Sequence, residues 1–260
     1  MIRRLVAVPP CRCNSTRLWG KPLQPIAPGR AIVEHLARSL RQCPCVADVR
    51  FAIARGPGDT ALVDLAQRME LAYCLGSEQD VLGRVIATAE EAGATDVLRK
   101  TSEDPFFDPQ LLGPAWARHL GQENDVTAVD LLPEGTAFEI FTLAALRRCH
   151  ENGDAEDREH IANYARFHQS EFALEILHPE PACRRLDLRL TIDTPEDLIV
   201  CRAVFSNLGG RERLIPIPEI VRFLDDHPEL TRLNAHLAER QATWEGVPQR
   251  SGGRGTVDHA

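Results

Sequence analysis

The sequence lacks any apolar run long enough to cross a bilayer. It also lacks the N-terminal pattern of a secretory signal, because Arg3 and Arg4 lead into only about five apolar residues. An excess of positive charge is absent too: the formal net charge of the 260 residues is −8, which argues against binding to the phosphates of a nucleic acid. We therefore expect a cytoplasmic protein that binds neither membranes nor nucleic acids.

The CxxC pairs of a structural zinc site are missing as well, although the chain contains eight cysteines. Two CxC pairs, Cys11 with Cys13 and Cys43 with Cys45, have the wrong spacing, and the other four cysteines are scattered. A cytoplasmic chain of this size has little use for disulfides. We therefore expect free and buried thiols.

Neither GxxxxGKS/T nor GxGxxG occurs, so the chain carries neither a P-loop nor a dinucleotide fingerprint. What it does carry is the loop at residues 12–23, RCNSTRLWGKPL, which follows an apolar run at residues 5–8 that predicts a buried first strand. Arg12, Arg17 and Lys21 supply charge, and small hydroxyl side chains and loop amides supply neutral donors, which together suit a polyphosphate. The alternative is a solvated basic loop between a strand and a helix.

Short apolar runs alternate with helical patterns through the first half of the chain. This alternation implies right-handed βαβ crossovers and a largely parallel sheet with helices on both faces. Ligands of such sheets bind beyond the carboxyl ends of the strands, which is where the basic loop lies. The predicted strands are residues 5–8, 49–54, 71–74, 96–100 and 126–131, and the predicted helices are residues 59–70, 81–92 and 109–120.

The second half is less regular. No internal repeat or linker divides the chain, so we expect one domain over residues 1–245, with a small inserted α+β subregion at about 133–180. The polar, glycine-rich tail at 246–260 is expected to be disordered. The remaining predicted strands are residues 138–142, 172–177 and 189–192, and the remaining predicted helices are residues 143–151, 159–167, 195–208, 217–226 and 229–240.

Two segments, residues 101–109 and 189–197, place acidic side chains at the carboxyl end of a predicted strand. Carboxylates at the carboxyl end of a strand suit Mg²⁺, which prefers one or two of them together with phosphate oxygens and water. Asp193 leaves a short strand directly before a predicted helix, where Thr194 suits the N-cap. Capping is the alternative role for Asp104, Asp108 and Asp193, while Asp197 fits a first-turn position beside the helix dipole.

The loop at residues 12–23 resembles the signature loop of the sugar-acid cytidylyltransferases, which activate 3-deoxy-manno-octulosonate and acylneuraminate. Further motifs, in consistent order over roughly residues 5–235, resemble the branch typified by the spore-coat polysaccharide protein F type. They are the segment from Gly76 to Arg84, Arg99-x-Thr101, Pro105, Asp108-Pro109, Gly135, Glu139, Arg158-Glu159-His160 and the segment from Arg189 to Asp197.

This resemblance implies a nucleotide-diphospho-sugar-transferase-like (Rossmann-like) α/β fold. It implies Mg²⁺-dependent transfer of CMP from CTP to a small anionic acceptor, with release of pyrophosphate. On the same basis the acceptor is a sugar acid, or a phosphonate or phosphate in a specialised pathway. Relatives suggest a homodimer that uses the region around residues 135–180.

The resemblance also assigns roles to residues. Arg12 and Lys21 are expected to hold the triphosphate as catalytic residues, and Ser15, Thr16 and Arg17 complete the loop. Further contacts to the nucleotide are expected from Asp80 and Arg84, metal ligation from Glu103 and Asp193, and acceptor binding from Arg158, His160 and Glu139.

Several points stay open at this level. His160 is a hypothetical general base, although a lone histidine is more often structural, and Glu159 equally suits a helix start. Relatives carry an aspartate where this chain has Glu103, a small residue in place of Asn14, and a proline in place of Trp19. Two other functions remain: a glycosyltransferase that uses a nucleotide sugar, although no DxD-like site is evident, and a non-catalytic nucleotide-binding protein.

Overall fold

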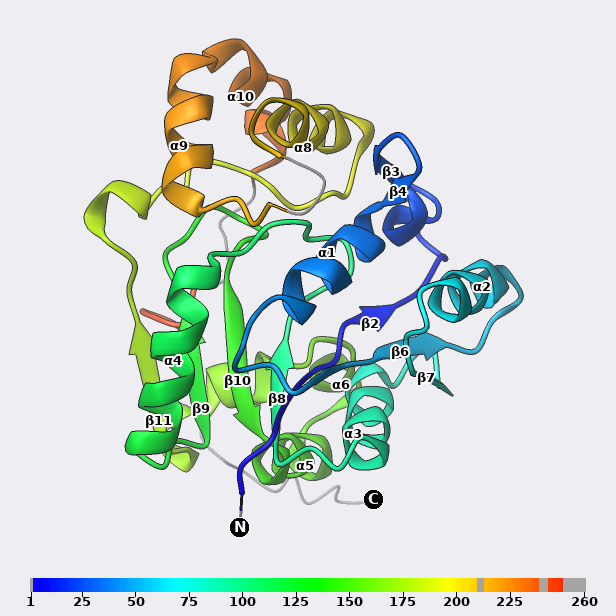
Figure 1. The fold of residues 1–260 in the computed structure, drawn as a ribbon. Helices are drawn as coiled ribbons and strands as arrows, with labels where there is room; N and C mark the ends of the chain where they lie inside the picture. Colours follow the sequence, from blue (N-terminus) through cyan, green and yellow to red (C-terminus); the bar gives the residue numbers. More distant parts are fainter. Residues whose placement is uncertain (1, 210–212, 239–242, 250–260) are drawn as a thin grey trace, which may run out of the picture.

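Strand β1 lies inside a six-stranded sheet whose order is β11-β9-β10-β8-β1-β5. In this computed structural model, which describes residues 2–209, 213–238 and 243–249, β1 pairs in parallel with β5 and β8 (Figure 1). An antiparallel strand, β10, separates β8 from β9. The strands are β1 (Leu5–Ala7), β5 (Asp48–Val49), β8 (Asp96–Arg99), β9 (Val126–Val129), β10 (Phe138–Thr142) and β11 (Leu174–Leu177).

The chain continues from β1 into a second, three-stranded parallel sheet of order β2-β6-β7. The predicted strand at 5–8 forms β1 of the main sheet, and the chain then adds β2 to the second sheet. The predicted strand at 49–54 likewise contains the end of β5, in the main sheet, and all of β6, in the second. A two-stranded antiparallel hairpin completes the β structure. These strands are β2 (Pro10–Cys11), β6 (Phe51–Ala54), β7 (Tyr73–Gly76), β3 (Pro25–Ala27) and β4 (Arg30–Ala31).

Ten α-helices lie among the described residues, and they cover both faces of the main sheet and one of its ends. Helices α8, α9 and α10 (yellow to orange) sit together above the end of the sheet at the top of Figure 1. The helices are α1 (Ile32–Arg41), α2 (Thr60–Arg68), α3 (Val81–Glu91), α4 (Pro109–Gly121), α5 (Leu143–Asn152), α6 (Ala155–Glu159), α7 (Asn163–Phe167), α8 (Pro195–Leu208), α9 (Ile217–Asp226) and α10 (Pro228–Asn234).

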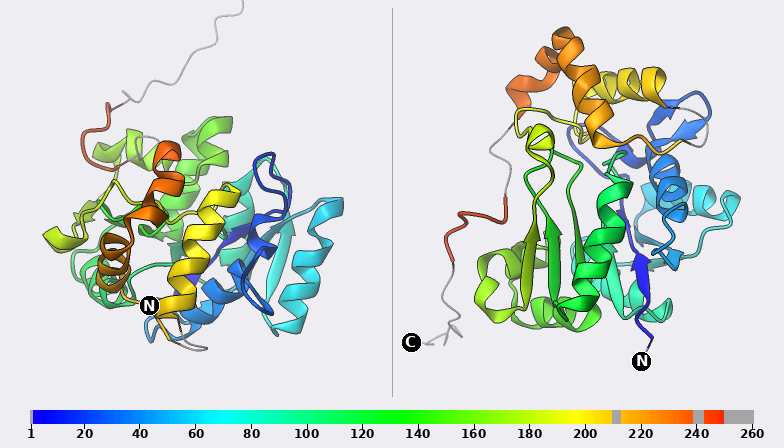
Figure 2. Two further views of the ribbon diagram at one scale, coloured as in Figure 1. Left: turned by 90° about the horizontal axis from the view of Figure 1, so that it is seen from above. Right: turned by 60° about the vertical axis from the view of Figure 1, so that its left-hand side comes forward.

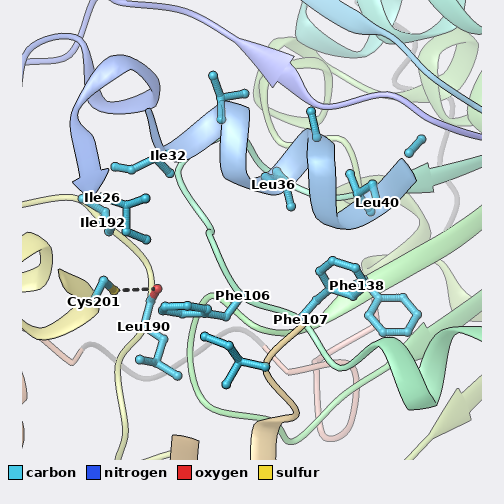
Figure 3. Close-up of a cluster of buried hydrophobic side chains, with 14 of the residues drawn as sticks. Ile26, Ile32, Leu36, Leu40, Phe106, Phe107, Phe138, Leu190, Ile192 and Cys201 are labelled. Atoms are coloured by element: carbon cyan, nitrogen blue, oxygen red, sulfur yellow. Dashed lines mark hydrogen bonds between the residues drawn. The ribbon is translucent and has the colours of Figure 1, made fainter. Parts of the chain in front are cut away.

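The side chains of β1 alternate between two hydrophobic clusters, as the pleat of a strand requires. Leu5 and Ala7 point into the cluster that contains α1, α4 and α8, whereas Val6 points into the cluster that contains α3 and α5. Figure 3 shows part of the first cluster, to which Ile32, Leu36 and Leu40 of α1 belong together with Phe106. Burial on both faces explains why this strand reads as an uninterrupted apolar run.

These observations confirm the predicted α/β class and the mostly parallel sheet. The antiparallel strand β10 differs from a purely parallel arrangement for a simple reason: residues 130–137 join β9 to β10 without a helix. A connection this short reverses the chain direction, whereas a parallel neighbour needs a longer crossover. The predicted strand at 189–192 is reduced to an isolated bridge between Arg189 and Glu134.

Three helix predictions need correction. Helix α1 was not predicted, although Ile32, Leu36 and Leu40 repeat every four residues and are buried. Of the predicted helix at 159–167, only residues 163–167 form a helix of their own, α7; Glu159 is the last residue of α6, because His160 leaves the helical conformation at φ −107° and ψ 80°. The predicted helix at 229–240 begins one residue earlier and gives way to a 3-10 turn after Asn234; residues 239–240 lie outside the described part.

Four residues of the tail that is expected to be disordered, 246–249, are described in the structure. Trp244, just before it, is 2% exposed. Gln249 accepts a hydrogen bond from the amide of Gln169 at 2.8 Å and donates one to the carbonyl of Arg166 at 3.3 Å. These contacts fix residues 246–249 against α7 and the turn after it, and residues 250–260 lie outside the described part.

All eight cysteines are free thiols, and six of them are buried, as predicted; Cys45 and Cys74 are partly exposed. Over the residues that the structure covers, no helix combines the length and the apolar content needed to cross a membrane.

Candidate active site

A cleft of about 290 Å³ opens beyond the carboxyl ends of β2 and β8, the end of the sheets that the topology predicts for a ligand. The basic loop forms one wall, and the segment after β8, the end of α6 and Asp193 form the others. The lining residues are Pro10, Arg12, Asn14, Ser15, Arg17, Lys21, Pro22, Val81, Arg84, Arg99, Thr101, Ser102, Glu103, Glu159, His160, Ile161 and Asp193.

The basic loop is held at both ends. At its start, the buried carboxylate of Asp59 accepts a hydrogen bond from the amide of Cys13 at 2.7 Å. Gly20 closes the loop: it adopts φ 62°, which glycine reaches without strain, and its amide donates to the carbonyl of Cys13 at 2.9 Å. A short 3-10 turn with Pro22 in its first turn follows at once. Lys21 therefore enters the cleft from a backbone that is fixed on both sides.

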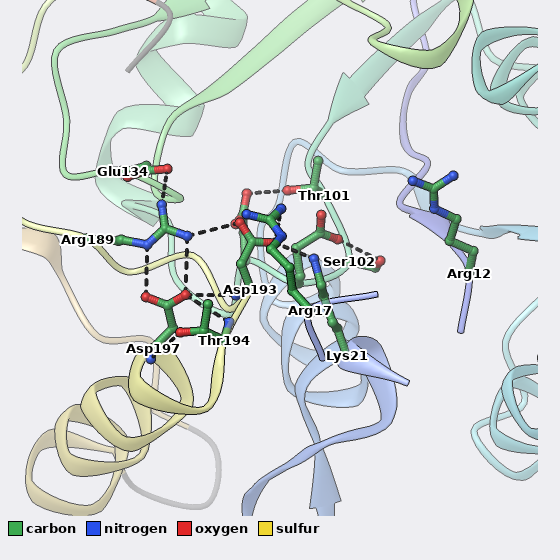
Figure 4. A network of polar contacts seen from close by, with 12 residues as sticks. Arg12, Arg17, Lys21, Thr101, Ser102, Glu134, Arg189, Asp193, Thr194 and Asp197 are labelled. Carbon is green, nitrogen blue, oxygen red and sulfur yellow. Dashed lines mark hydrogen bonds and ion pairs between the residues drawn. The ribbon is translucent and has the colours of Figure 1, made fainter. Parts of the chain in front are cut away.

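The carboxylate of Asp193 forms ion pairs with three cationic side chains (Figure 4). Lys21 donates to its Oδ1, Arg17 lies 3.1 Å from the same oxygen, and Arg189 lies 3.0 Å from Oδ2. Burial raises the pKa of this carboxyl, but the bond from Lys21 and the three positive charges outweigh that effect. The net pKa of Asp193 is therefore below its usual value, and the group is a carboxylate.

Arg189 holds Asp193 in place and is itself only 5% exposed. Its guanidinium binds Asp197 at 2.9 Å and also binds Glu134. Asp197 in turn closes a capping box with Thr194 at the start of α8. The position of Asp193 therefore depends on a buried ion-pair network rather than on the loop alone.

The segment after β8 brings Glu103 to the same cleft. The amide of Ile192 donates to the carbonyl of Glu103 at 3.2 Å, which ties this segment to the strand-like stretch before Asp193. Gly135 permits that stretch to pass, because a Cβ atom at this position would lie 2.4 Å from the amide nitrogen of Thr191. Burial raises the pKa of the Glu103 carboxyl, and the neighbouring Asp104 raises it further.

Glu103 and Asp193, the two carboxylates expected from the sequence to hold a metal, both line the cleft. Within the described ranges, no group of three or more histidine, cysteine or acidic side chains has the arrangement of a metal site. Two carboxylates without a third protein ligand do not suit structural zinc, but they suit Mg²⁺, which takes its remaining oxygens from phosphates and water.

The third cation of the basic loop, Arg12, lies apart from Asp193, and so does Asn14. Arg12 binds Glu159 at 3.2 Å across the cleft, and Asn14 donates to Glu78 at 2.9 Å. Ser15 lines the cleft. Thr16 is not among the described lining residues, and neither is Trp19, whose side chain is 63% exposed.

Of the two further residues expected to contact the nucleotide, Arg84 lines the cleft and Asp80 is not among its described lining residues. Arg84 lines the cleft, but its guanidinium donates to the carbonyls of Ala52, at 3.0 Å, and Ser77, so it braces the turn before α3. Asp80 caps α3 through the amide of Gly83 at 2.8 Å and lies outside the described cleft lining.

The three residues expected at the acceptor are not brought together. His160 lines the cleft, whereas the guanidinium of Arg158 donates to the carbonyl of His150 at 3.3 Å, away from it. Glu139 lies in a second cavity of about 170 Å³ that shares Arg99 with the cleft. The lining residues of the second cavity are Arg99, Asp104, Asp130, Gly135, Ala137, Glu139, Arg166 and Trp244.

Polar atoms in this second cavity have spare hydrogen-bonding capacity. Glu139 accepts from Arg99 at 3.2 Å and from the indole of Trp244 at 3.3 Å. In the part of the chain that the structure describes, Nε of Arg99, Nε of Arg166 and Oδ1 of Asp104 are buried without a hydrogen-bond partner. The second cavity is therefore built to accept further polar groups.

Sequence reasoning did not assign a role to four residues of these two cavities. Arg99 ends β8 at the ligand-binding edge, so its position was a usable signal. Glu159 was considered only as a helix start. No local pattern pointed to Arg166 or Trp244, since each reaches the second cavity from a separate part of the chain.

Comparison with known proteins supports the α/β assignment. A cytidylyltransferase from Leptospira borgpetersenii has a similar structure, with a TM-score of 0.81, 21% identity, and coverage of 88% of this chain and 97% of that one. The structure of a CMP:2-keto-3-deoxy-manno-octonic acid synthetase complexed with CTP aligns with a TM-score of 0.60 and 15% identity, covering 78% and 99%. These similarities confirm the predicted Rossmann-like fold.

The sequence itself gives the family. The spore coat polysaccharide biosynthesis protein SpsF of Bacillus subtilis is 28% identical over 228 residues, which cover 84% of this chain and 92% of that protein. The sequence model of the cytidylyltransferases matches residues 6–238, nearly the whole chain. Both findings agree with the resemblance that the ordered motifs indicate. The chain therefore belongs to the cytidylyltransferase family and is a nucleotidyltransferase enzyme.

Proposed function

We propose that the enzyme transfers CMP from CTP to a small anionic acceptor, a sugar acid or a phosphonate or phosphate, and releases pyrophosphate. One observation carries the proposal: Arg12, Arg17 and Lys21 share a cleft with Glu103 and Asp193 at the carboxyl end of the sheet. Family membership and the CTP-bound structural neighbour support it. We further propose that the enzyme acts as a homodimer.

In this reaction an acceptor oxygen attacks the α-phosphorus, and the bond from that phosphorus to the pyrophosphate oxygen breaks. The protein aligns the reactants and neutralises the charge that develops on the phosphates. We assign that neutralisation to Arg12, Arg17 and Lys21, which line the cleft. His160 lines the same cleft and is our candidate to take the acceptor's proton.

Glu103 and Asp193 are the residues that we propose to hold Mg²⁺. When bound, this ion supplies Lewis-acid charge that stabilises the phosphate oxygens of the transition state. Asp193 already binds Lys21 and Arg17, so the carboxylate must give up these partners if they are to reach the phosphates.

Pyrophosphate release tests the function directly. The wild type is incubated with each nucleoside triphosphate, with Mg²⁺ or with EDTA, and with sugar-acid, phosphonate and phosphate acceptors. We expect release with CTP and Mg²⁺ only. Lys21→Ala should lower kcat/KM by about 100-fold, the usual effect of removing one group that stabilises transition-state charge. Arg68→Ala, which removes one exposed positive charge on α2, is the matched control. Full turnover by Lys21→Ala would contradict the role of this residue.

A second test needs no acceptor. The sequence contains two lysines, Lys21 and Lys100, and Lys100 is only 1% exposed. Reductive methylation should therefore modify Lys21 in preference to Lys100. Addition of CTP and Mg²⁺ should protect Lys21, as measured by peptide mass spectrometry, while Mg²⁺ without nucleotide serves as the control. Equal modification of Lys21 with and without CTP would argue against nucleotide binding at this residue.

A further inference from the structure

Arg12 and Glu159 form an ion pair across the cleft from residues 147 positions apart in the sequence. The Nη2 atom of Arg12 lies 3.2 Å from Oε1 of Glu159, and both side chains are about half exposed, at 43% and 45%. In Figure 4, Arg12 stands apart from the group formed by Lys21, Arg17 and Asp193. Arg12 and Lys21 therefore have different anionic partners within one cleft.

Three carboxylates are present among the described residues that line this cleft: Glu103, Asp193 and Glu159. In the proposed function, Mg²⁺ replaces the positive charges that Asp193 gives up. Glu159 has no such replacement, because its cationic partner in the cleft is Arg12 and the metal ligands are the other two carboxylates. A triphosphate that takes Arg12 therefore leaves the Glu159 carboxylate unpaired beside a polyanion, which is unfavourable.

We propose that Glu159 is an internal counter-ion that competes with the phosphates for Arg12 and so determines how tightly the enzyme holds nucleotide and pyrophosphate. This inference rests on the proposed use of CTP. The competition applies equally to substrate and product, since both present phosphate oxygens to Arg12. Glu159 therefore weakens the binding of CTP and favours the departure of pyrophosphate.

The test is calorimetric titration of the full-length protein with CTP in the presence of Mg²⁺, and separately with pyrophosphate. Glu159→Gln keeps the size of the side chain and removes its charge. We expect it to tighten binding of both ligands about two- to fivefold, the range that exposed ion pairs contribute. The matched control is Glu156→Gln, which removes the same charge from an exposed position one turn earlier on α6 and should leave both affinities unchanged.

A double-mutant cycle separates competition for Arg12 from general repulsion. Glu159→Gln should tighten binding less in an Arg12→Ala background than in the wild type. The change in log Kd should be less than half as large. An equal gain in both backgrounds, no gain in the wild type, or the same gain from Glu156→Gln would each overturn the inference. If the wild type itself fails to bind CTP with Mg²⁺, the proposed function fails. CTP binding that Glu159→Gln leaves unchanged overturns the inference alone.

Discussion

Asp193 holds together the cationic side chains on one side of the cleft. Its carboxylate binds Lys21, Arg17 and Arg189, and the pKa of this group is depressed by them despite its burial. Lys21 and Arg17 come from the loop, and in the proposed function they leave Asp193 for the phosphates. Arg189 is buried and is bound to Asp197 of the capping box, so it remains bound to Asp193 when the loop cations leave. The same carboxylate positions the loop cations in this structure and, under that proposal, offers a ligand to Mg²⁺.

His35 carries a pH prediction at the same scale. Burial of His35, together with the smaller effect of the positive charge on Arg30, lowers its pKa to about 4. Its ring packs against the edges of Phe205 and Phe106. The unfolded chain binds this proton near pH 6.5 and the native protein near pH 4, so stability is complete above about 6.5 and falls as the pH falls. At pH 5 the loss is about 2 kcal/mol.

Urea unfolding between pH 7 and pH 5 measures this loss. His35→Leu should remove about that much of the pH dependence, because the titrating group is gone. His236→Leu replaces an exposed histidine and is the control, expected to keep the wild-type slope. A His35→Leu protein with the same slope as the wild type would refute the assignment.

At the scale of elements, the start of α8 couples the stability of the fold to the geometry of the site. Thr194 caps the helix and Pro195 occupies its first turn, as the sequence predicts. Asp197, predicted only as a first-turn charge, is fully buried and binds Arg189 and Asn234. It also accepts the amides of Asp193 and Thr194, each at 3.0 Å.

Asp197→Asn should therefore affect both stability and binding. Replacing the buried carboxylate leaves Arg189 without its main partner, which costs about 3–5 kcal/mol for a buried pair. It should also weaken CTP binding severalfold, since Asp193 loses the support for its amide. Thr194→Ala is the control: it removes the cap alone, at about 1 kcal/mol, and leaves CTP affinity unchanged. Urea unfolding and calorimetry measure the two effects. CTP affinity equal in the two variants would refute the coupling.

The helices and strands differ in how well the sequence predicts them. Elements with a clear local period were predictable: the strand at β1, the helices α3 and α4, and the cap of α8 all follow from apolar spacing and capping residues. Helix α1 had a readable period and was missed, whereas the break at His160 depends on tertiary contacts. The grouping of Arg12, Lys21, Glu103 and Asp193 followed from motif order. Their partners did not, because pairs such as Arg12 with Glu159 depend on how distant segments meet.

For the whole molecule, the segment 243–249 joins the end of the chain to the sheet. Figure 2 shows this segment (red) running beside the strands on the side of β11. The amide of Trp244 donates to Asp130 at 2.5 Å, and its indole donates to Glu139. The guanidinium of Arg166 lies 5.3 Å from the indole centroid. Trp244 therefore lines the second cavity and contacts Asp130, Glu139 and Arg166, all of which are remote from it in the sequence.

Trp244→Ala tests whether this closure belongs to the fold or to nucleotide binding. Truncating a buried tryptophan costs about 3–5 kcal/mol, so the midpoint of urea unfolding should fall clearly. CTP affinity should stay within about twofold, because the second cavity shares Arg99 with the cleft but none of the loop cations. Trp116→Ala, at a partly buried tryptophan on α4, is the control for the loss of an indole. Weakened CTP binding in Trp244→Ala, but not in Trp116→Ala, would mean that the two cavities act as one site through Arg99.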